Sequence, residues 1–318
     1  MRNSALFALS LLSSALCFAA EDYPSKPVRV IVPFAPGGTS DLTARVISQQ
    51  LSEQLGKSFV VDNRAGASGA IGNSIVARAA PDGYTILLVD TTLTIIPSLF
   101  KSLPFDVTRD FTPITQIIGN PNVLVVHPSI KAASAKDFIA SAQENPGKLN
   151  YGSAGLGSIT HLSGELFNRA AKIKITHIPY KGAGEAIASV LGGQVEILIT
   201  GISTVIPHVE SRKLRALAVT TDGKRSAAMP DVPSMQEAGL PGMAIYAWYG
   251  LSGPTGISKA VAHKLHSEVV KALALPIVRD RFQGSELVGS SPGQFTVHTR
   301  NELQRWADVI KSAGITLD

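Results

Sequence analysis

The stretch VRVIVPFAPGGTSDLTARVISQQLSEQL, residues 28–55, decides the fold class because it joins a strand to a helix through a glycine loop. Residues 28–32 are almost all apolar, and the apolar side chains of residues 42–55 recur at helical spacing. The loop between them contains two prolines, the pair Gly37-Gly38 and residue types that favour helix N-caps. The helix therefore begins at the loop, and its first backbone N–H groups and positive dipole end face whatever the loop holds.

This loop is an anion site in outline, although an ordinary strand-to-helix turn accounts for it equally well when it is considered alone. The order Gly37-Gly38-Thr39 matches neither the dinucleotide-binding fingerprint nor the phosphate loop with its lysine. Nucleotide binding is therefore not the expected function.

Residues 1–20 are predicted to be a signal peptide. Arg2 supplies a positive start, and the apolar run that follows is too short for a membrane span. Cleavage is expected after Ala19, because cleavage after Ala20 would put the bulky Phe18 at the minus-three position. The sole cysteine leaves with this segment, so the exported chain has neither a disulfide nor thiol chemistry.

The charge balance is mildly basic, with 29 lysines and arginines against 24 aspartates and glutamates. Loss of Arg2 with the signal peptide lowers the net charge from +5 to +4. The basic residues are scattered along the chain, as on a solvated surface, so no nucleic-acid partner is expected. The small positive excess favours an acidic small molecule as ligand. About 299 residues remain after cleavage, which exceeds one compact core and indicates two domains.

Strand and helix patterns alternate along most of the chain, which indicates an α/β fold. A first series ends near residue 90, and two strands at 112–118 and 123–127 follow with the turn Gly119-Asn120-Pro121 between them. A second series fills residues 149–219. An aromatic strand and three helices complete the pattern, at residues 244–252, 258–273, 276–282 and 292–313.

The second series reads as an insertion between two halves of the first. Chain crossings near 123–128 and 244–252 would then form a hinge between two lobes. We expect the first lobe to consist of residues 21–123 and 245–318, and the second lobe of residues 124–244.

Two loops of similar design are the candidate binding elements. Ligands of parallel α/β sheets sit beyond the carboxyl ends of the strands, where loops meet helix N-termini. Pro36–Asp41 in the first lobe and Gly152–Ser158 in the second both combine glycines with hydroxyl side chains. If they face each other, their amides and hydroxyls suit recognition of a carboxylate by neutral donors.

Other arrangements of reactive residues are incomplete. His161 and Glu165 stand four residues apart on one predicted helix, but no third metal ligand lies nearby, so a polar helix face is expected. Ser153 lacks the earlier glycine of a nucleophile elbow because residue 151 is Tyr. The pair Tyr180-Lys181 is interpreted as a surface turn.

Two further patterns have plain interpretations. Glycines 152, 155 and 157 imitate a dinucleotide loop, but Thr160 occupies the third required glycine position. Tyr246 and Trp248 alternate along the aromatic strand, which is typical of core residues, although at a hinge one of them could wall the cleft.

These motifs together resemble the substrate-binding proteins of tripartite tricarboxylate transporters, the Bug receptors, over nearly the whole exported chain. The resemblance is carried by Pro33–Gly38 with Asp41 and Ala44-Arg45, Asn63-Arg64 with Gly66–Gly69, Pro81–Tyr84, Tyr151–Ser153 with Gly155, Gly157-Ser158 and His161-Leu162, Pro179–Gly182, and Trp248 with Gly250-Leu251 and Pro254.

The resemblance implies two Rossmann-like lobes joined by two hinge crossings, as in type II periplasmic binding proteins. It implies a periplasmic, monomeric receptor that closes on a small organic carboxylate and delivers it to membrane permease subunits, with no catalytic residue, cofactor or metal. Ligand contacts are expected from the two loops and nearby strand ends, at Phe34, Ala35, Gly38, Thr39, Ser40, Asp41, Thr91, Thr92, Ser153, Gly157, Ser158, His161, Tyr180, Gly201 and Ser203.

Two points stay open at the level of sequence. A carboxylate at Asp41 would repel an anion, so Asp41 either caps the helix or meets a hydroxyl or ammonium group of the ligand. The family often has an acidic or amide residue after the strand ending near Ile199, where this chain has Thr200–Ser203. An amino-acid ligand is therefore disfavoured relative to a plain organic acid or an aromatic carboxylate.

Two rival functions belong to other classes. An exported hydrolase or metal-dependent enzyme would use His161, Glu165, Ser153 or Asp41. A ligand sensor for a signalling partner would have the same binding cleft without transport.

Overall fold

The computed structural model describes residues 23–316, so the predicted signal peptide and its cleavage site lie outside the described part of the chain. The strands are β1 (Val28–Val32), β2 (Phe59–Asn63), β3 (Thr85–Asp90), β4 (Phe111–Val126), β5 (Asn150–Ser153), β6 (Thr176–Pro179), β7 (Ile197–Gly201), β8 (Arg215–Val219), β9 (Tyr246–Pro254) and β10 (Glu286–Leu287). The α-helices are α1 (Thr39–Leu55), α2 (Ala70–Ala77), α3 (Thr92–Ile95), α4 (Ala135–Glu144), α5 (Ile159–Ala171), α6 (Ala183–Leu191), α7 (Ile202–Glu210), α8 (Lys259–Ala274), α9 (Pro276–Arg281) and α10 (Pro292–Ala313).

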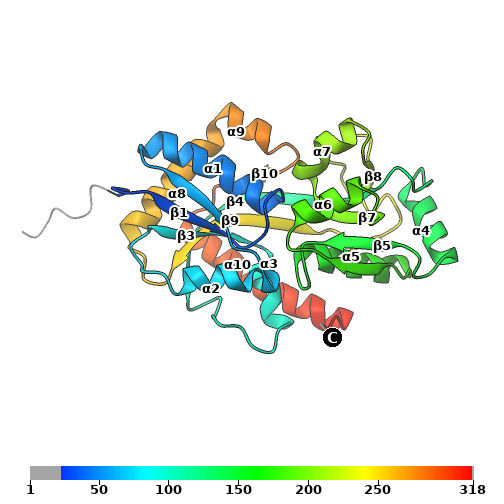
Figure 1. Ribbon diagram of the computed structural model, residues 1–318, viewed down its shortest axis with the longest axis horizontal. Coiled ribbons are helices and arrows are strands. Elements are labelled where there is room, and N and C mark those ends of the chain that lie inside the picture. Colours follow the sequence, from blue (N-terminus) through cyan, green and yellow to red (C-terminus); the bar gives the residue numbers. More distant parts are fainter. Residues whose placement is uncertain (1–22, 317–318) are drawn as a thin grey trace, which may run out of the picture.

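The strands form two α/β lobes, and one continuous strand order, β2-β1-β3-β9-β4-β7-β5-β6, runs through both of them (Figure 1). Outside this order, β8 and β10 both pair with β4. In the first lobe β1 pairs in parallel with β2 and β3, and in the second β5 pairs in parallel with β6 and β7. Helices cover both faces of each lobe: α1 and α8 lie opposite α2 and α10, and α6 and α7 lie opposite α5. The predicted two-lobed α/β fold is confirmed.

The central strands of the first lobe are apolar because helices bury both of their faces. On one face, Val30 belongs to the same core cluster as Ile47 of α1. On the other face, Ile31 belongs to a cluster with Val76 of α2 and Phe295 of α10. Alternate side chains of β1 therefore pack into two hydrophobic cores on opposite faces of the sheet. This packing fixes the direction of the strand and the position of the loop that follows it.

The sequence prediction of two strands around a turn at residues 119–121 is wrong. β4 is one strand of 16 residues that pairs with β9 from Phe111 to Pro121 and with β7 and β8 from Asn122 onward. β4 therefore changes neighbours between Pro121 and Asn122, next to the crossing predicted near 123–128. Pro121 is tolerated because the strand changes neighbours there, so its missing amide donor falls where one ladder ends.

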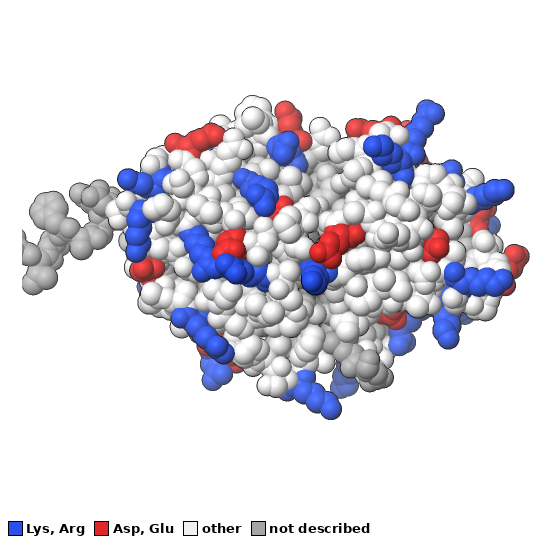
Figure 2. Space-filling model, viewed as in Figure 1, with Lys and Arg blue, Asp and Glu red and all other residues white. Residues whose placement is uncertain are grey.

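The limits predicted for the lobes, 123/124 and 244/245, remain our proposal. On the face drawn in Figure 2, basic and acidic side chains are interspersed. A search of residues 23–316 for a helix long and apolar enough to cross a membrane finds none.

Candidate functional site

A cavity of about 30 Å³ lies between the lobes, beyond the carboxyl ends of β3 and β7. This volume has room for about two water molecules. The lobes touch beside it, where the Ala35 amide meets the Lys181 carbonyl oxygen and Gly184 approaches Pro36, so they are in a closed arrangement. Both lobes line it, through Phe34, Ala35, Gly38, Thr39, Ser40, Asp90, Thr92, Ala154, Ser158, Ile159, Thr160, Ala183, Thr200 and Tyr249.

Three helices begin at this cavity. The N-cap residues of α1, α5 and α6 are Gly38, Ser158 and Gly182. The two glycines bring no capping side chain, whereas the Ser158 hydroxyl accepts a hydrogen bond from the His161 amide at 3.2 Å. Backbone N–H groups and positive dipole ends from both lobes therefore converge on one small space, which is favourable for a negative charge.

The floor of the cavity is formed by Asp90 of β3 and Tyr249 of β9, which are paired across the sheet. Asp90 accepts hydrogen bonds from the Ser40 hydroxyl at 2.8 Å and from the Thr92 amide at 2.9 Å. Burial raises the pKa of Asp90, and these hydrogen bonds offset the effect only in part. Burial, and after it the charge of Asp90, raises the pKa of Tyr249. No lysine, arginine or histidine is among the described residues that line the cavity.

Thr200 at the end of β7 presents a hydroxyl from the second lobe. The residue is 1% exposed and lines the cavity, and its Oγ1 has no hydrogen-bond partner among the described residues. A buried hydroxyl without a hydrogen-bond partner is destabilising unless a ligand or a water molecule forms that hydrogen bond. Thr200 is therefore a second-lobe candidate for direct ligand contact.

The two lobes touch at the mouth of the cavity through backbone and small side chains. The Ala35 amide donates to the Lys181 carbonyl oxygen at 3.2 Å, and the Ser68 hydroxyl donates to the Leu156 carbonyl oxygen. Gly184 lies so close to the opposite lobe that a Cβ atom there would overlap the Pro36 carbonyl oxygen. The lobes can therefore approach this closely only because residue 184 is a glycine and has no side chain.

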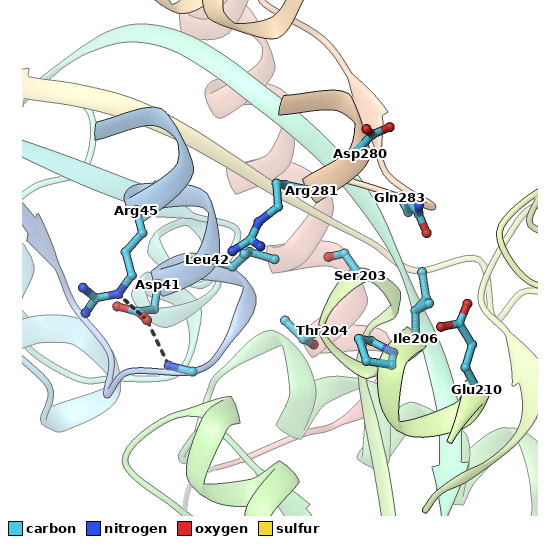
Figure 3. Close-up of a pocket in the computed structure, with 12 residues that line it drawn as sticks. Asp41, Leu42, Arg45, Ser203, Thr204, Ile206, Glu210, Asp280, Arg281 and Gln283 are labelled. Atoms are coloured by element: carbon cyan, nitrogen blue, oxygen red, sulfur yellow. Dashed lines mark hydrogen bonds and ion pairs between the residues drawn. The ribbon is translucent and has the colours of Figure 1, made fainter. Parts of the chain in front are cut away.

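Asp41 lies outside the cavity and stabilises the loop before α1 (Figure 3). It accepts hydrogen bonds from the Gly37 amide at 3.1 Å, from Arg45 at 2.9 Å and from Asn63 at 3.0 Å. Burial raises the pKa of Asp41, but the hydrogen bonds from Arg45, Gly37 and Asn63 outweigh it and hold the pKa below its usual value. Asp41 instead lines a neighbouring groove of about 450 Å³, together with the expected ligand contact Ser203.

The second-lobe residues Ser153 and His161 take part in a buried cluster beneath the loop. Ser153 Oγ lies 2.5 Å from His177 Nε2, and the His177 ring lies 4.2 Å from the His161 ring and 4.9 Å from the Tyr151 ring. The Tyr151 hydroxyl donates to Glu165 at 2.6 Å. Ser153 is fully buried. This arrangement holds β5, β6 and α5 together and does not present a nucleophile to the cavity.

Acid is expected to destabilise the fold through His177. Burial, and after it the neighbouring His161, lowers the pKa of His177 from 6.5 to about 3. Because the unfolded chain protonates first, the stabilisation from neutral His177 is complete above pH 6.5 and is lost as the pH falls toward 3. After discounting for solvent screening, we expect His177→Gln to reduce the fall in unfolding free energy over this range by about 2 kcal/mol.

Urea unfolding between pH 3 and pH 7 measures this difference. The exposed His263 on α8 supplies the control His263→Gln, which should keep the wild-type pH profile. A His177→Gln profile parallel to that of the wild type would contradict the assignment.

The remaining expected contacts lie near the cavity without lining it. Thr91 is bonded to β9, since its hydroxyl accepts from the Trp248 amide at 2.7 Å. Gly157 faces Leu99 and Phe100 of the first lobe, and Gly201 backs onto Thr39 and Asn120. The Tyr180 hydroxyl is bonded to Ser189 and its side chain lines a separate pocket of about 220 Å³.

Seven expected contacts line the cavity, and seven other lining residues were not predicted. The seven predicted ones are Phe34, Ala35, Gly38, Thr39, Ser40, Thr92 and Ser158, and the seven missed are Asp90, Ala154, Ile159, Thr160, Ala183, Thr200 and Tyr249. An acidic residue that closes an otherwise apolar strand is the signal that could have identified Asp90. Within residues 23–316, no group of three or more His, Cys, Asp or Glu side chains could hold a metal ion.

Comparison with known proteins gives a consistent relationship along the chain. Residues 43–315 match the family model described as Tripartite tricarboxylate transporter family receptor. BugT of Bordetella pertussis is 38% identical over 303 residues, which cover 94% of this chain and 93% of BugT.

Two solved structures of similar proteins contain carboxylates. An R. palustris protein with adipate has a TM-score of 0.89 and is 36% identical in sequence. The match covers 93% of this chain and 99% of the R. palustris chain. MatC from Rhodopseudomonas palustris with bound malate has a TM-score of 0.86 and is 32% identical in sequence. The match covers 91% of this chain and 100% of the MatC chain. The protein therefore belongs to the Bug receptor family of tripartite tricarboxylate transporters.

Proposed function

We propose that this protein is an extracytoplasmic receptor that captures a small organic carboxylate between its lobes. The observation that carries the proposal is the convergence of three helix N-termini, from α1, α5 and α6, on one interlobe cavity. The hydroxyls of Thr39, Ser158 and Thr200 supply further neutral donors beside them. Relatives that contain adipate and malate support a carboxylate as the class of ligand.

Recognition by amides and hydroxyls has a consequence for how the ligand enters. Both lobes line the cavity and touch at its mouth, so a solute enters while the lobes are apart, and closure then brings Ser158 and Thr200 of the second lobe to it. Neutral donors orient a carboxylate without a fixed counter-charge, and their bonds strengthen as closure removes water.

We propose further that the signal peptide directs the chain to the periplasm and that the loaded receptor docks on membrane permease subunits. The family supports this partner, since it consists of receptors of tripartite transporters. The proposed role is binding and delivery, without catalysis. Co-purification of permease subunits with the solute-loaded receptor would distinguish transport from a purely sensory role.

Calorimetry of the exported chain against mono-, di- and tricarboxylates is expected to find at least one ligand. Thr200→Val should then weaken its binding about tenfold, because a hydrogen bond to a charged group contributes about 1.5 kcal/mol or more. Its stability should not fall, because the Thr200 hydroxyl has no protein partner among the described residues.

Thr43→Val is the matched control, since the Thr43 hydroxyl on α1 is also buried and unpartnered among the described residues but lies outside the cavity lining. It should leave affinity unchanged. A broad carboxylate panel without a binder, together with tight binding of another chemical class, would overturn the proposed function.

A further inference from the structure

Asp90 stands in apparent conflict with an anionic ligand. It is 6% exposed and lines, at the end of β3, the same cavity as the three helix N-termini. Its carboxylate accepts hydrogen bonds from the Ser40 hydroxyl and the Thr92 amide, and neither donor carries a charge. A carboxylate brought into the same cavity would face a second carboxylate in a space from which water is largely excluded. Two such groups cannot both stay ionised at low cost.

Among residues 23–316, the surroundings of Asp90 offer no cation that would resolve this conflict. From β9 the titratable group that faces it is Tyr249. On α1, Asp41 and Arg45 are bonded to each other, and on β1, Arg29 is paired with Asp62 at 2.5 Å. The described residues of α2 and α3 include no titratable side chain. From the second lobe, His161 of α5 faces His177, and Glu185 of α6 accepts from the Lys181 amide.

We propose that Asp90 takes up one proton when the cleft closes on a carboxylate, so that its neutral carboxyl group donates a hydrogen bond to the bound anion; this rests on the proposed function. The proton comes from the solvent and binds one Asp90 oxygen, so the complex gains one proton for each ligand bound. The other oxygen keeps the bond from the Thr92 amide. The Ser40 hydroxyl can turn, because a hydroxyl both donates and accepts.

The direction of the pKa of Asp90 agrees with this proton uptake. Burial in the closed arrangement raises it. When the lobes part, water reaches the floor of the cavity because the second lobe supplies part of its cover, and the ionised form becomes easier to maintain. Closing therefore favours protonation, and a bound anion favours it further. Asp90 is thus a specificity-determining residue that selects a ligand able to accept its hydrogen bond.

The sign of the pH dependence follows from linkage. Affinity is highest below the pKa that Asp90 has in the open receptor, where the proton is already bound. It falls by up to tenfold per pH unit between the open-state and closed-state pKa values, and it levels off above the latter. A ligand that instead offered Asp90 an ammonium or hydroxyl group would leave it ionised and would show no uptake.

The test uses malate and adipate as probes, with any tighter member of the carboxylate panel. Calorimetry of the exported wild-type chain in buffers of different ionisation enthalpy counts the protons taken up, at pH values from 5 to 8. We expect an uptake that approaches one proton per ligand. Asp90→Asn, which holds a neutral donor in the same shape, should abolish the uptake, flatten the pH profile and bind at least as tightly as wild type at pH 8.

Asp62→Asn is the matched control, because it removes a carboxylate of the same sheet outside the cavity and should retain the uptake. Carboxylate binding without proton uptake, or with uptake that persists in Asp90→Asn, overturns the inference and leaves the proposed function standing. If no carboxylate binds to the wild type, the proposed function fails and the inference falls with it. A circular dichroism spectrum and a melting curve establish that Asp90→Asn is folded before its binding is compared.

Discussion

Gly184→Ala is expected to weaken solute binding substantially while leaving the protein folded. Gly184 lies in the first turn of α6, where alanine is a better helix former than glycine, so the second lobe itself accepts the methyl group. In the closed arrangement, however, the new Cβ atom would overlap the Pro36 carbonyl oxygen and come within 2.9 Å of the Gly37 Cα. Backbone cannot rotate away as a flexible side chain can, so the lobes must stop short of closure.

The expected cost of this overlap is about 1–3 kcal/mol of binding free energy, or a dissociation constant about 5- to 150-fold weaker. Calorimetry measures the affinity, and small-angle scattering should show a smaller solute-induced decrease in the radius of gyration. Gly192→Ala is the control, since a Cβ at the other end of α6 would meet only the Ala188 and Ser189 carbonyl oxygens, at 3.4 Å or more. Wild-type affinity in Gly184→Ala would show that binding does not require this contact.

Trp306→Ala is expected to lower the free energy of unfolding by about 3–5 kcal/mol. The Trp306 ring is 1% exposed within the main hydrophobic core, and its Nε1 donates to Glu302 at 3.0 Å. The Trp248 Nε1 donates to the same carboxylate oxygen at 3.2 Å. Alanine at residue 306 would leave a cavity and would remove one of the two indole donors to the buried Glu302 carboxylate. The fold would therefore lose both packing and a buried hydrogen bond.

Urea unfolding monitored by circular dichroism measures this loss, because the midpoint falls at an unchanged slope when only stability changes. Trp306→Phe keeps most of the ring and should lose less. Val297→Ala on the same helix, at a site 58% exposed, should change the free energy of unfolding by about 0.5 kcal/mol or less. A Trp306→Ala midpoint equal to that of wild type would show that α10 contributes little to the core.

Local signals predicted the helices well because caps and apolar spacing act within a few residues of each other. α10 covers Pro292–Ala313, the range that the sequence predicts, and it begins after its capping residue Ser291. The segment 119–121 shows the limit of such signals. Gly119-Asn120-Pro121 is typical of a turn, but β9 on one side and β7 and β8 on the other keep β4 extended. Strands distant in the sequence decide this conformation.

The site was predictable in part for the same reason. Gly38, Ser40 and Ser158 belong to predicted loops whose composition is typical of a helix N-terminus, and all three line the cavity. The aromatic strand was less informative, since alternation puts Trp248 and Tyr249 on opposite faces without saying which face meets the cavity. Trp248 turns to Glu302 in the first-lobe core, whereas Tyr249 forms part of the floor.

The glycines at the mouth of the cavity bear on how long a captured solute stays. Gly38 approaches Ala183, and Gly184 approaches Pro36 and Gly37, so the opposing surfaces are backbone and methyl groups. Such surfaces have few rotamers to reorganise and little apolar area to expose when they part, and the barrier to opening is correspondingly low. The residence time is then governed by the bonds that the solute itself makes, and good and poor ligands should differ in dissociation rate far more than in association rate.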